Sequence, residues 1–131
     1  MGEGGATDRD ARRVLLCDDA VAFSILFRRW MIDCGIDLVG QADSAQEAVA
    51  LAGDLQPHLI VIDHLLRDVT SDGLAPCLRD AAPHAKLLLI SGMPDDKLAA
   101  AAEAAGADGH ISKAATAEAM CHAVRALLPD D

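Results

Sequence analysis

Five side chains that could handle phosphate and a metal ion follow short apolar stretches of this 131-residue chain. They are the carboxylates of Asp18, Asp19 and Asp63, the hydroxyl of Ser91 and the ammonium group of Lys113. Three carboxylates at one place would repel one another and raise each other's pKa. A hard divalent cation such as Mg²⁺, which prefers oxygen ligands, removes that conflict. The set therefore indicates a site at which a metal ion and several acids act together.

The chemistry that such a set supports is phosphoryl transfer. With a cation bound, one carboxylate can act as a nucleophile toward phosphorus and form an aspartyl phosphate. A lysine then offsets charge on the phosphoryl oxygens, and a hydroxyl donates a hydrogen bond to them. Positioning and electrostatics are most of what this reaction requires. A simpler interpretation, in which each acid is an ordinary turn or cap residue, suffices for any one of them but less well for all five groups.

The elements that must position these groups are strands. Runs rich in Val, Ile and Leu predict five strands, over residues 14–17, 36–42, 58–63, 86–91 and 109–112. Continuous apolar runs are typical of strands buried on both faces, and so of a parallel sheet covered by helices.

Ala-rich segments with helical periodicity separate these strands and predict five helices, over about 21–34, from 44 onward, 72–81, 94–105 and 116–128. Ser44 and Glu47 have the spacing of a capping box, and Gly35 and Gly106 are suited to follow a helix end. On the first helix, one apolar stripe can cover the sheet; it comprises Ala20, Phe23, Leu26, Phe27, Trp30 and Cys34.

This alternation predicts an α/β fold, a doubly wound, five-stranded parallel sheet of order 2-1-3-4-5 with five helices, of the flavodoxin-like kind. Ligands of such sheets bind beyond the carboxyl ends of the strands, which is where the five groups lie. We expect one domain over residues 12–128, a flexible N-terminal tail over 1–11 and a C-terminal tail over 129–131.

Composition excludes several classes of protein. A formal net charge of −10 argues against direct binding of nucleic acid, because phosphate would be repelled. No apolar run approaches the roughly 20 residues that span a bilayer, which argues against a membrane protein, and the N-terminus lacks the apolar region of a secretory signal. The four cysteines show neither close pairing nor zinc spacing. They are typical of a reduced, cytoplasmic protein.

In their order and separations, Asp18-Asp19, Asp63, Ser91 and Lys113 resemble the receiver domain of two-component response regulators, over about Arg12 to Leu128. Two acids after a strand are common, whereas the ordered combination is specific. The resemblance implies a phosphoacceptor that is not an enzyme beyond its self-catalysed phosphorylation and dephosphorylation. It implies a sensor histidine kinase or histidine phosphotransfer protein as partner. If the chain is the complete protein, it resembles the stand-alone, chemotaxis-type regulators, whose output is a contact with another protein.

The resemblance also implies a role for each residue. Asp63 would be the phosphoacceptor, Asp19 a direct Mg²⁺ ligand, and Asp18 would hold the metal largely through water. The backbone carbonyl of Leu65 would be a further metal ligand. The remaining site residues would contact the phosphoryl group (Lys113, Ser91 and the Gly92 N–H) or act as a switch (Ser91 and His110).

Three departures from the family's pattern bear on these roles. After Asp63 the usual Met-Pro is missing and Asp72-Gly73 comes two residues late, which predicts a longer, mobile loop. Lys113 is followed by Ala114 rather than by a cis proline, so we expect a lysine that is less rigidly aimed. His110 replaces the usual aromatic ring; a pH-sensitive switch and a half-exposed edge histidine remain open as interpretations.

Apolar residues on the first helix also lie off the stripe that covers the sheet. Val21, Ala22 and Ile25 sit just after Asp18-Asp19, and Val21 and Ile25 are one turn apart. They predict a docking patch for the helical bundle that carries the donor phosphohistidine. The alternative is that they are scattered exposed apolar residues, which are common.

Two other functions remain open at this point. The same fold could be a pseudo-receiver, a docking adaptor that works without phosphorylation; the altered loops favour it and the intact acids and lysine oppose it. A small phosphatase with an Asp nucleophile is the less favoured alternative, because such enzymes carry a second acid two residues after the nucleophile, where this chain has Leu65.

Overall fold

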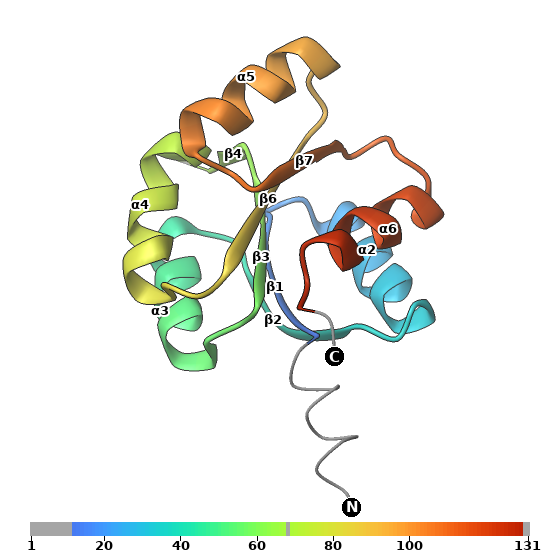
Figure 1. Ribbon diagram of the computed structural model, residues 1–131, viewed down its shortest axis with the longest axis horizontal. Helices are drawn as coiled ribbons and strands as arrows, with labels where there is room; N and C mark the ends of the chain where they lie inside the picture. The colour runs from blue at the N-terminus through green and yellow to red at the C-terminus, as the bar shows by residue number, and fades with distance from the viewer. Residues whose placement is uncertain (1–11, 68, 130–131) are drawn as a thin grey trace, which may run out of the picture.

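The computed structural model describes residues 12–67 and 69–129. Five parallel strands form one sheet in the order β2-β1-β3-β6-β7 (Figure 1). They are β1 (Arg13–Cys17), β2 (Asp37–Ala42), β3 (Leu59–Asp63), β6 (Lys86–Ser91) and β7 (Gly109–Ser112). Counted along the chain, this is the predicted order 2-1-3-4-5. The flavodoxin-like fold class is therefore confirmed.

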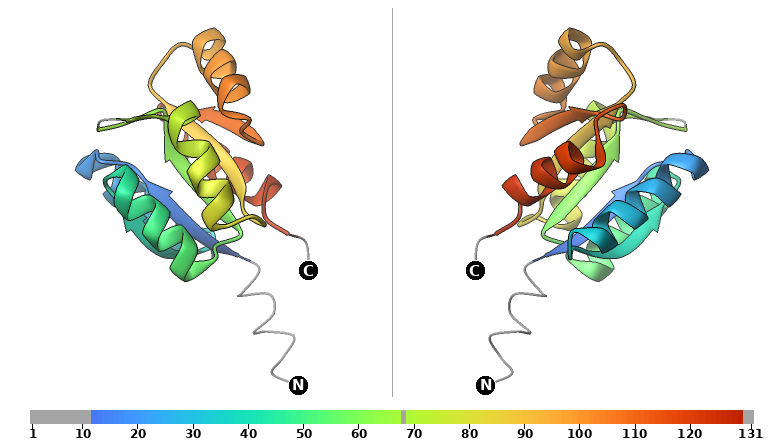
Figure 2. Two further views of the ribbon diagram at one scale, coloured as in Figure 1. Left: turned by 90° about the vertical axis from the view of Figure 1, so that its left-hand side faces the viewer. Right: turned by 90° about the vertical axis from the view of Figure 1, so that its right-hand side faces the viewer.

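Five helices cover the two faces of the sheet. They are α2 (Val21–Asp33), α3 (Ala45–Leu55), α4 (Ser71–Ala81), α5 (Asp95–Ala105) and α6 (Ala117–Ala126). Helices α2 and α6 cover one face, while α3, α4 and α5 cover the other (Figures 1 and 2). All five predicted helices are present, with ends within one or two residues of those expected. Over the described part of the chain, no helix is long and apolar enough to cross a membrane.

The predicted helix ends show two kinds of cap. Gly35 and Gly106 have φ angles of +74° and +67°, the left-handed conformation that a glycine adopts without steric cost. At the start of α3, Ser44 Oγ accepts a hydrogen bond from the Glu47 N–H at 3.2 Å. The Glu47 carboxylate accepts from the Asp43 N–H at 3.0 Å. The capping box thus differs from the usual one in its second hydrogen bond, which comes from the residue before Ser44.

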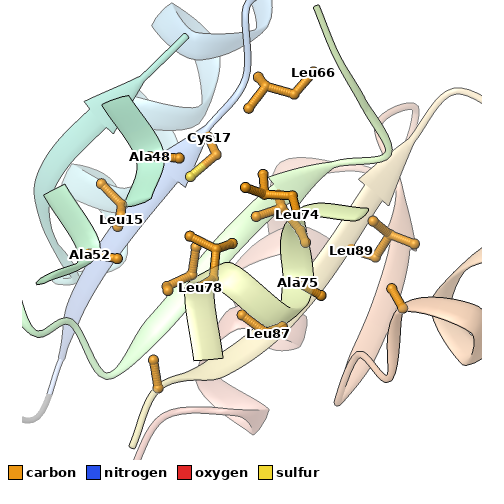
Figure 3. Packing of buried hydrophobic residues seen from close by; sticks show 14 of the residues in the cluster. Leu15, Cys17, Ala48, Ala52, Leu66, Leu74, Ala75, Leu78, Leu87 and Leu89 are labelled. Carbon is orange, nitrogen blue, oxygen red and sulfur yellow. The ribbon is translucent and has the colours of Figure 1, made fainter. Parts of the chain in front are cut away.

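The sheet separates two apolar clusters, because successive strand residues point to opposite faces. Leu15 and Cys17 of β1 pack toward α3 and α4, where Figure 3 shows them near Ala48 and Leu78. Val14 and Leu16 of β1, together with Leu59 and Val61 of β3, pack against α2 and α6 on the opposite face. Burial of these side chains is the main force that holds the strand ends, and so the site, in place.

Helix α2 buries a narrower stripe than the sequence predicts. Leu26, assigned to the covered face, is 51% exposed, and that part of the prediction is wrong. Its buried apolar side chains are Phe23, Phe27 and Met31, which are four residues apart and so form a single ridge. Leu26 lies beside this ridge, about 100° around the helix from Phe27, and therefore faces away from the sheet.

A second, two-stranded sheet follows the end of β3, where the sequence predicted a longer, mobile loop. Strands β4 (Leu65–Leu66) and β5 (Val69–Thr70) pair antiparallel and form a hairpin before α4. Within the hairpin, the side chain of Leu66 is fully buried, whereas that of Leu65 is exposed. Figure 2 shows β4 and β5 reaching past the large sheet, at the end where β1 and β3 finish. The expected loop is thus a defined structure that borders the candidate site.

Candidate functional site

The three predicted carboxylates come together beyond the carboxyl ends of two adjacent strands. Asp18 follows β1, and Asp63 is the last residue of β3, which pairs with β1. One carboxylate oxygen from each of Asp18, Asp19 and Asp63 lies within 4.8 Å of the others. This spacing allows all three to face one cation.

Lys113 brings a positive charge to the same place from the edge strand β7. Its Nζ lies 2.7 Å from Asp18 Oδ2 and 3.1 Å from Asp63 Oδ2. The lysine is held at its backbone, where its N–H donates to the Ser91 carbonyl at 2.9 Å. Neighbouring strands β6 and β7, in which Ser91 pairs with Ser112, thereby aim the side chain at the acids.

The surroundings of Asp63 raise the pKa of its carboxyl above the ordinary value. Burial raises the pKa of this carboxyl, the Lys113 charge opposes the rise, and the Asp18 charge adds to it, so the net direction is upward. For Lys113, burial acts to lower the pKa, but contacts with Asp18 and Asp63 outweigh it and the pKa is raised. The lysine therefore stays protonated and offsets part of the negative charge.

Asp18 is the most buried acid of the cluster, with 1% of its surface exposed. Its Oδ1 accepts a hydrogen bond from the Ala20 N–H at 2.7 Å. Its Oδ2 lies 2.7 Å from the Lys113 ammonium nitrogen and forms an ion pair with it. A buried carboxylate beside two further carboxylates forms an acidic oxygen site that fits a hard cation such as Mg²⁺.

Asp19 is exposed, and its carboxylate is bound by a residue that was not predicted to belong to the site. Its Oδ2 accepts a hydrogen bond at 3.1 Å from the backbone N–H of Arg67, in the turn of the β4–β5 hairpin. Arg67 was not among the residues predicted for the site. No signal in the sequence pointed to it, because the contact joins residues 48 positions apart and uses the backbone.

The remaining predicted groups surround Asp63. Asp63 Oδ1 accepts from the Leu65 N–H at 3.4 Å, so the start of the hairpin lies against the acid. Ser91 is buried, and its Oγ accepts from the Met93 N–H at 3.1 Å. Beside it, a Cβ added to Gly92 would meet no atom within 4 Å, which leaves open space at this position.

The turn after Lys113 closes without a cis bond. Among the described residues no peptide bond is cis, so Lys113 is joined to Ala114 by a trans peptide. The Ser112 hydroxyl accepts from the Ala114 N–H at 3.0 Å, and the Ser112 carbonyl accepts from the Ala115 N–H at 3.1 Å. These bonds shape the turn in place of the family's proline.

Neither His64 nor His110 belongs to the acid cluster. His64 directly follows Asp63, but its Nδ1 lies 2.7 Å from Ser71 Oγ at the start of α4, so it is directed away as expected for a neighbour in a strand. His110 is exposed on β7, opposite Leu89 of β6, and does not join the cluster.

The residues predicted for partner docking lie at the surface of α2. The exposed fractions of Val21 and Ile25 are 72% and 65%, and Ala22 is exposed as well. Leu26 and Ile32 extend this apolar surface along the helix. On the buried side of the same turn, the Phe23 ring lies under the Lys113 ammonium group.

Comparison with known proteins gives a consistent result. Residues 14–125 match the response regulator receiver domain family. The response regulator protein VraR of Staphylococcus aureus is 31% identical over 114 residues, which cover 86% of this chain and 54% of VraR. The chain thus spans about half the length of these curated relatives.

Solved structures resemble the chain over most of its length. A two-component response regulator of the LuxR family from Aurantimonas sp. SI85-9A1 superposes with a TM-score of 0.78 at 26% identity, covering 88% of this chain and 83% of that one. A response regulator protein from Burkholderia pseudomallei, crystallised with a phosphorylated aspartic acid and a calcium ion, superposes with a TM-score of 0.73 at 28% identity. The match covers 86% of this chain and 66% of that one.

Proposed function

Since the chain belongs to the response regulator receiver domain family, we propose that it accepts a phosphoryl group on Asp63 with Mg²⁺ and signals through contacts with other proteins. Receiver domains are phosphoacceptors that are generally not classed as enzymes, interact with histidine kinases, and generally bind Mg²⁺ at an acidic pocket. The proposed donor is the phosphohistidine of a cytoplasmic sensor kinase domain or of a histidine phosphotransfer protein.

One observation carries the proposal: Lys113 Nζ lies between Asp18 and Asp63, with three carboxylates grouped around one point. In the alternative function, a docking adaptor that works without phosphorylation, the lysine would only neutralise the acids. Three carboxylates with oxygens within 4.8 Å of one another are better explained by a bound cation, and the exposed Gly92 leaves room beside Ser91 for a phosphoryl group. The relative from Burkholderia pseudomallei carries both a phosphorylated aspartic acid and a divalent cation.

In the proposed reaction, a carboxylate oxygen of Asp63 attacks the phosphorus of the donor. The new O–P bond forms as the P–N bond to the donor histidine breaks, and the imidazole leaves with that electron pair. Mg²⁺, when bound, supplies positive charge that offsets repulsion between the carboxylates and the phosphoryl oxygens. Asp19, Asp18, Asp63 and the Leu65 carbonyl are the groups proposed to hold it.

The other residues act on the phosphoryl oxygens. Lys113 would exchange its contact with Asp63 for one with a phosphoryl oxygen and keep its charge there. The Ser91 hydroxyl and the Gly92 N–H would each donate a hydrogen bond to the same group. A shift of Ser91 toward the phosphoryl group is the proposed start of the switch, with His110 on the neighbouring strand as the residue that changes its exposure.

The decisive experiment is incubation with acetyl phosphate and Mg²⁺, followed by intact mass. Wild-type protein should gain the mass of one phosphoryl group, and Asp63→Asn should gain none. Asp54→Asn, an exposed acid on α3, is the matched control and should label like wild type. Unmodified wild-type protein would instead support the pseudo-receiver, and labelling of Asp63→Asn would mean that another residue is the acceptor.

A further inference from the structure

We propose that Arg67 is a positioning residue for the metal site: its side chain holds the β4–β5 hairpin to Asp43, which aims the Arg67 peptide N–H at Asp19. The inference rests on the proposed function, because it takes Asp19 to be a ligand of Mg²⁺. It adds a residue that belongs neither to the acid cluster nor to the groups proposed to contact the phosphoryl group.

Arg67 makes contacts in two directions. Its Nε donates to the Asp43 carbonyl at 2.7 Å, and its terminal nitrogen lies 3.3 Å from the Asp43 carboxylate. Its backbone N–H donates to Asp19 Oδ2 at 3.1 Å. Asp43 lies between β2 and α3, and its own N–H is held by Glu47. Arg67 thus connects the hairpin to the segment between β2 and α3, and its backbone N–H binds the carboxylate of Asp19.

The hairpin needs such a tie because it is short and locally unfavourable. Each strand has two residues, whereas isolated hairpins are marginally stable even when longer. Arg67 also has a φ of +52°, a conformation that a non-glycine residue rarely adopts unless its surroundings hold it there. Residues around Asp63 depend on the same hairpin, since Leu65 begins β4 and its N–H donates to Asp63.

A positioning role and a purely electrostatic role predict opposite results when the arginine is removed. A positive charge in the neighbourhood of a cation site repels the cation, so its removal alone should strengthen Mg²⁺ binding. If Arg67 instead orients Asp19, its removal frees the hairpin and the carboxylate, and Mg²⁺ binding should weaken. Loss of a group that orients a metal ligand typically weakens affinity by about 10-fold or more.

The test is a Mg²⁺ titration of the full chain, in which the amide chemical shifts of the site residues report binding. Arg67→Ala should raise the dissociation constant by about 10-fold. Arg28→Ala is the matched control, because Arg28 is an exposed arginine that bonds to Gln41 and not to the acid cluster. Its dissociation constant should stay at the wild-type value or fall slightly.

Two further variants separate the side chain from the backbone. Arg67→Gly suits the positive φ but lacks the guanidinium group, so it should weaken binding as Arg67→Ala does. Asp43→Ala removes only the carboxylate contact and keeps the bond from Arg67 Nε to the Asp43 carbonyl, so it should weaken binding less than Arg67→Ala does. Faster amide exchange in the hairpin, with the exchange of β1 and β3 unchanged, should accompany each of these losses.

Each outcome bears on a different claim. Unchanged or tighter Mg²⁺ binding in Arg67→Ala, with Asp19→Asn clearly weakened, would overturn the role of Arg67 and leave the proposed function intact. Wild-type protein that binds no Mg²⁺ would overturn both. Faster amide exchange throughout β1 and β3 in Arg67→Ala would show general unfolding of that variant. The test then passes to Arg67→Gly: if this variant is folded and binds Mg²⁺ as tightly as wild type, the inference is wrong.

Discussion

The Lys113 ammonium nitrogen lies 4.8 Å from the centre of the Phe23 ring, over its face. A cation over an aromatic ring is attracted to it, so α2 helps to fix the lysine that pairs with Asp18 and Asp63. Trp30 packs against the same ring in a T-shaped arrangement, with centroids 5.9 Å apart. The buried side of α2 therefore supports the acid cluster while its other side is exposed to partners.

The exposed side of α2 leads to a prediction about phosphotransfer. Ile25→Glu should slow transfer from a cognate histidine kinase by about 10-fold, because a charge in an apolar contact costs roughly 1–2 kcal/mol or more. Labelling by acetyl phosphate should hardly change, since Ile25 is 65% exposed and supports no buried group. The measurement is the initial rate of phosphorylation with each donor.

Ile32→Glu provides the control on the same helix. Ile32 is exposed to a similar extent, 63%, but lies two turns further from Asp18 and Asp19. It should slow transfer less than Ile25→Glu does. Equal loss with both donors would show that Ile25 supports the fold, and equal rates for wild type and Ile25→Glu would place docking elsewhere.

Substitution of the two adjacent acids should separate a direct metal ligand from an indirect one. Asp19→Asn should raise the Mg²⁺ dissociation constant by roughly 10-fold or more, and Asp18→Asn should raise it less. Asp18 already has a positive partner in Lys113, 2.7 Å away, and is proposed to reach the metal through water. The reverse order in a Mg²⁺ titration would exchange the two assignments.

The lifetime of the aspartyl phosphate should depend on Leu65. Hydrolysis needs a water molecule held for attack, and an apolar side chain two residues after the acceptor cannot hold it. Leu65 is 60% exposed beside Asp63, so a polar group placed there has room. Leu65→Asn should speed loss of the phosphoryl group several-fold, measured by intact mass over time after removal of the donor.

A surface Leu→Asn change elsewhere controls for general effects. Leu26→Asn on α2 alters a residue of similar exposure, and its phosphorylated form should decay at the wild-type rate. Rapid decay in wild-type protein that Leu65→Asn does not alter would contradict this account of the apolar position.

Stability in the absence of Mg²⁺ should depend on pH through Asp63. Its pKa is raised by burial above the ordinary value of 3.8, so the folded state binds its proton more tightly than the unfolded state. The free energy of unfolding should therefore fall as pH rises from about 3.8 through the raised pKa, by about 1.4 kcal/mol for each unit of difference.

Asp63→Asn removes that titration, so the variant should be more stable than wild type at pH 7 without Mg²⁺, and the difference should shrink toward pH 4. Urea unfolding at several pH values in EDTA measures both quantities. Added Mg²⁺ should stabilise wild type far more than the variant, because it binds the folded state. A variant less stable than wild type at pH 7 would contradict the upward direction of the Asp63 pKa.

Most of the fold follows from local patterns in the sequence. A run such as Leu59–Asp63 is fully apolar until its last residue, which fixes both a buried strand and the point where it meets solvent. Glycines with positive φ, such as Gly35 and Gly106, mark helix ends in the sequence because few other residues adopt that conformation. The meeting of Asp18, Asp63 and Lys113 then follows from the parallel order of the strands.

The parts that the sequence did not predict depend on contacts between distant residues. Strands of two residues carry no periodicity, so β4 and β5 were expected to be a loop. The turn between them uses an arginine with positive φ where glycine or asparagine would give a recognisable signal. Leu26 was assigned to the core because spacing alone gives the direction of a stripe, whereas its width depends on how closely the sheet approaches the helix.

The division of the core by the sheet also has a consequence for how the protein can diverge. Phe27 and Met120 share one cluster, whereas Leu74 and Leu78 share the other, with the strands between them. The effects of substitutions on opposite faces on the free energy of unfolding should therefore be additive, because the substituted residues have no packing partner in common. Helix α2 can acquire a new surface for a new partner while α3, α4 and α5 keep their packing, so recognition can evolve without a matching change across the sheet.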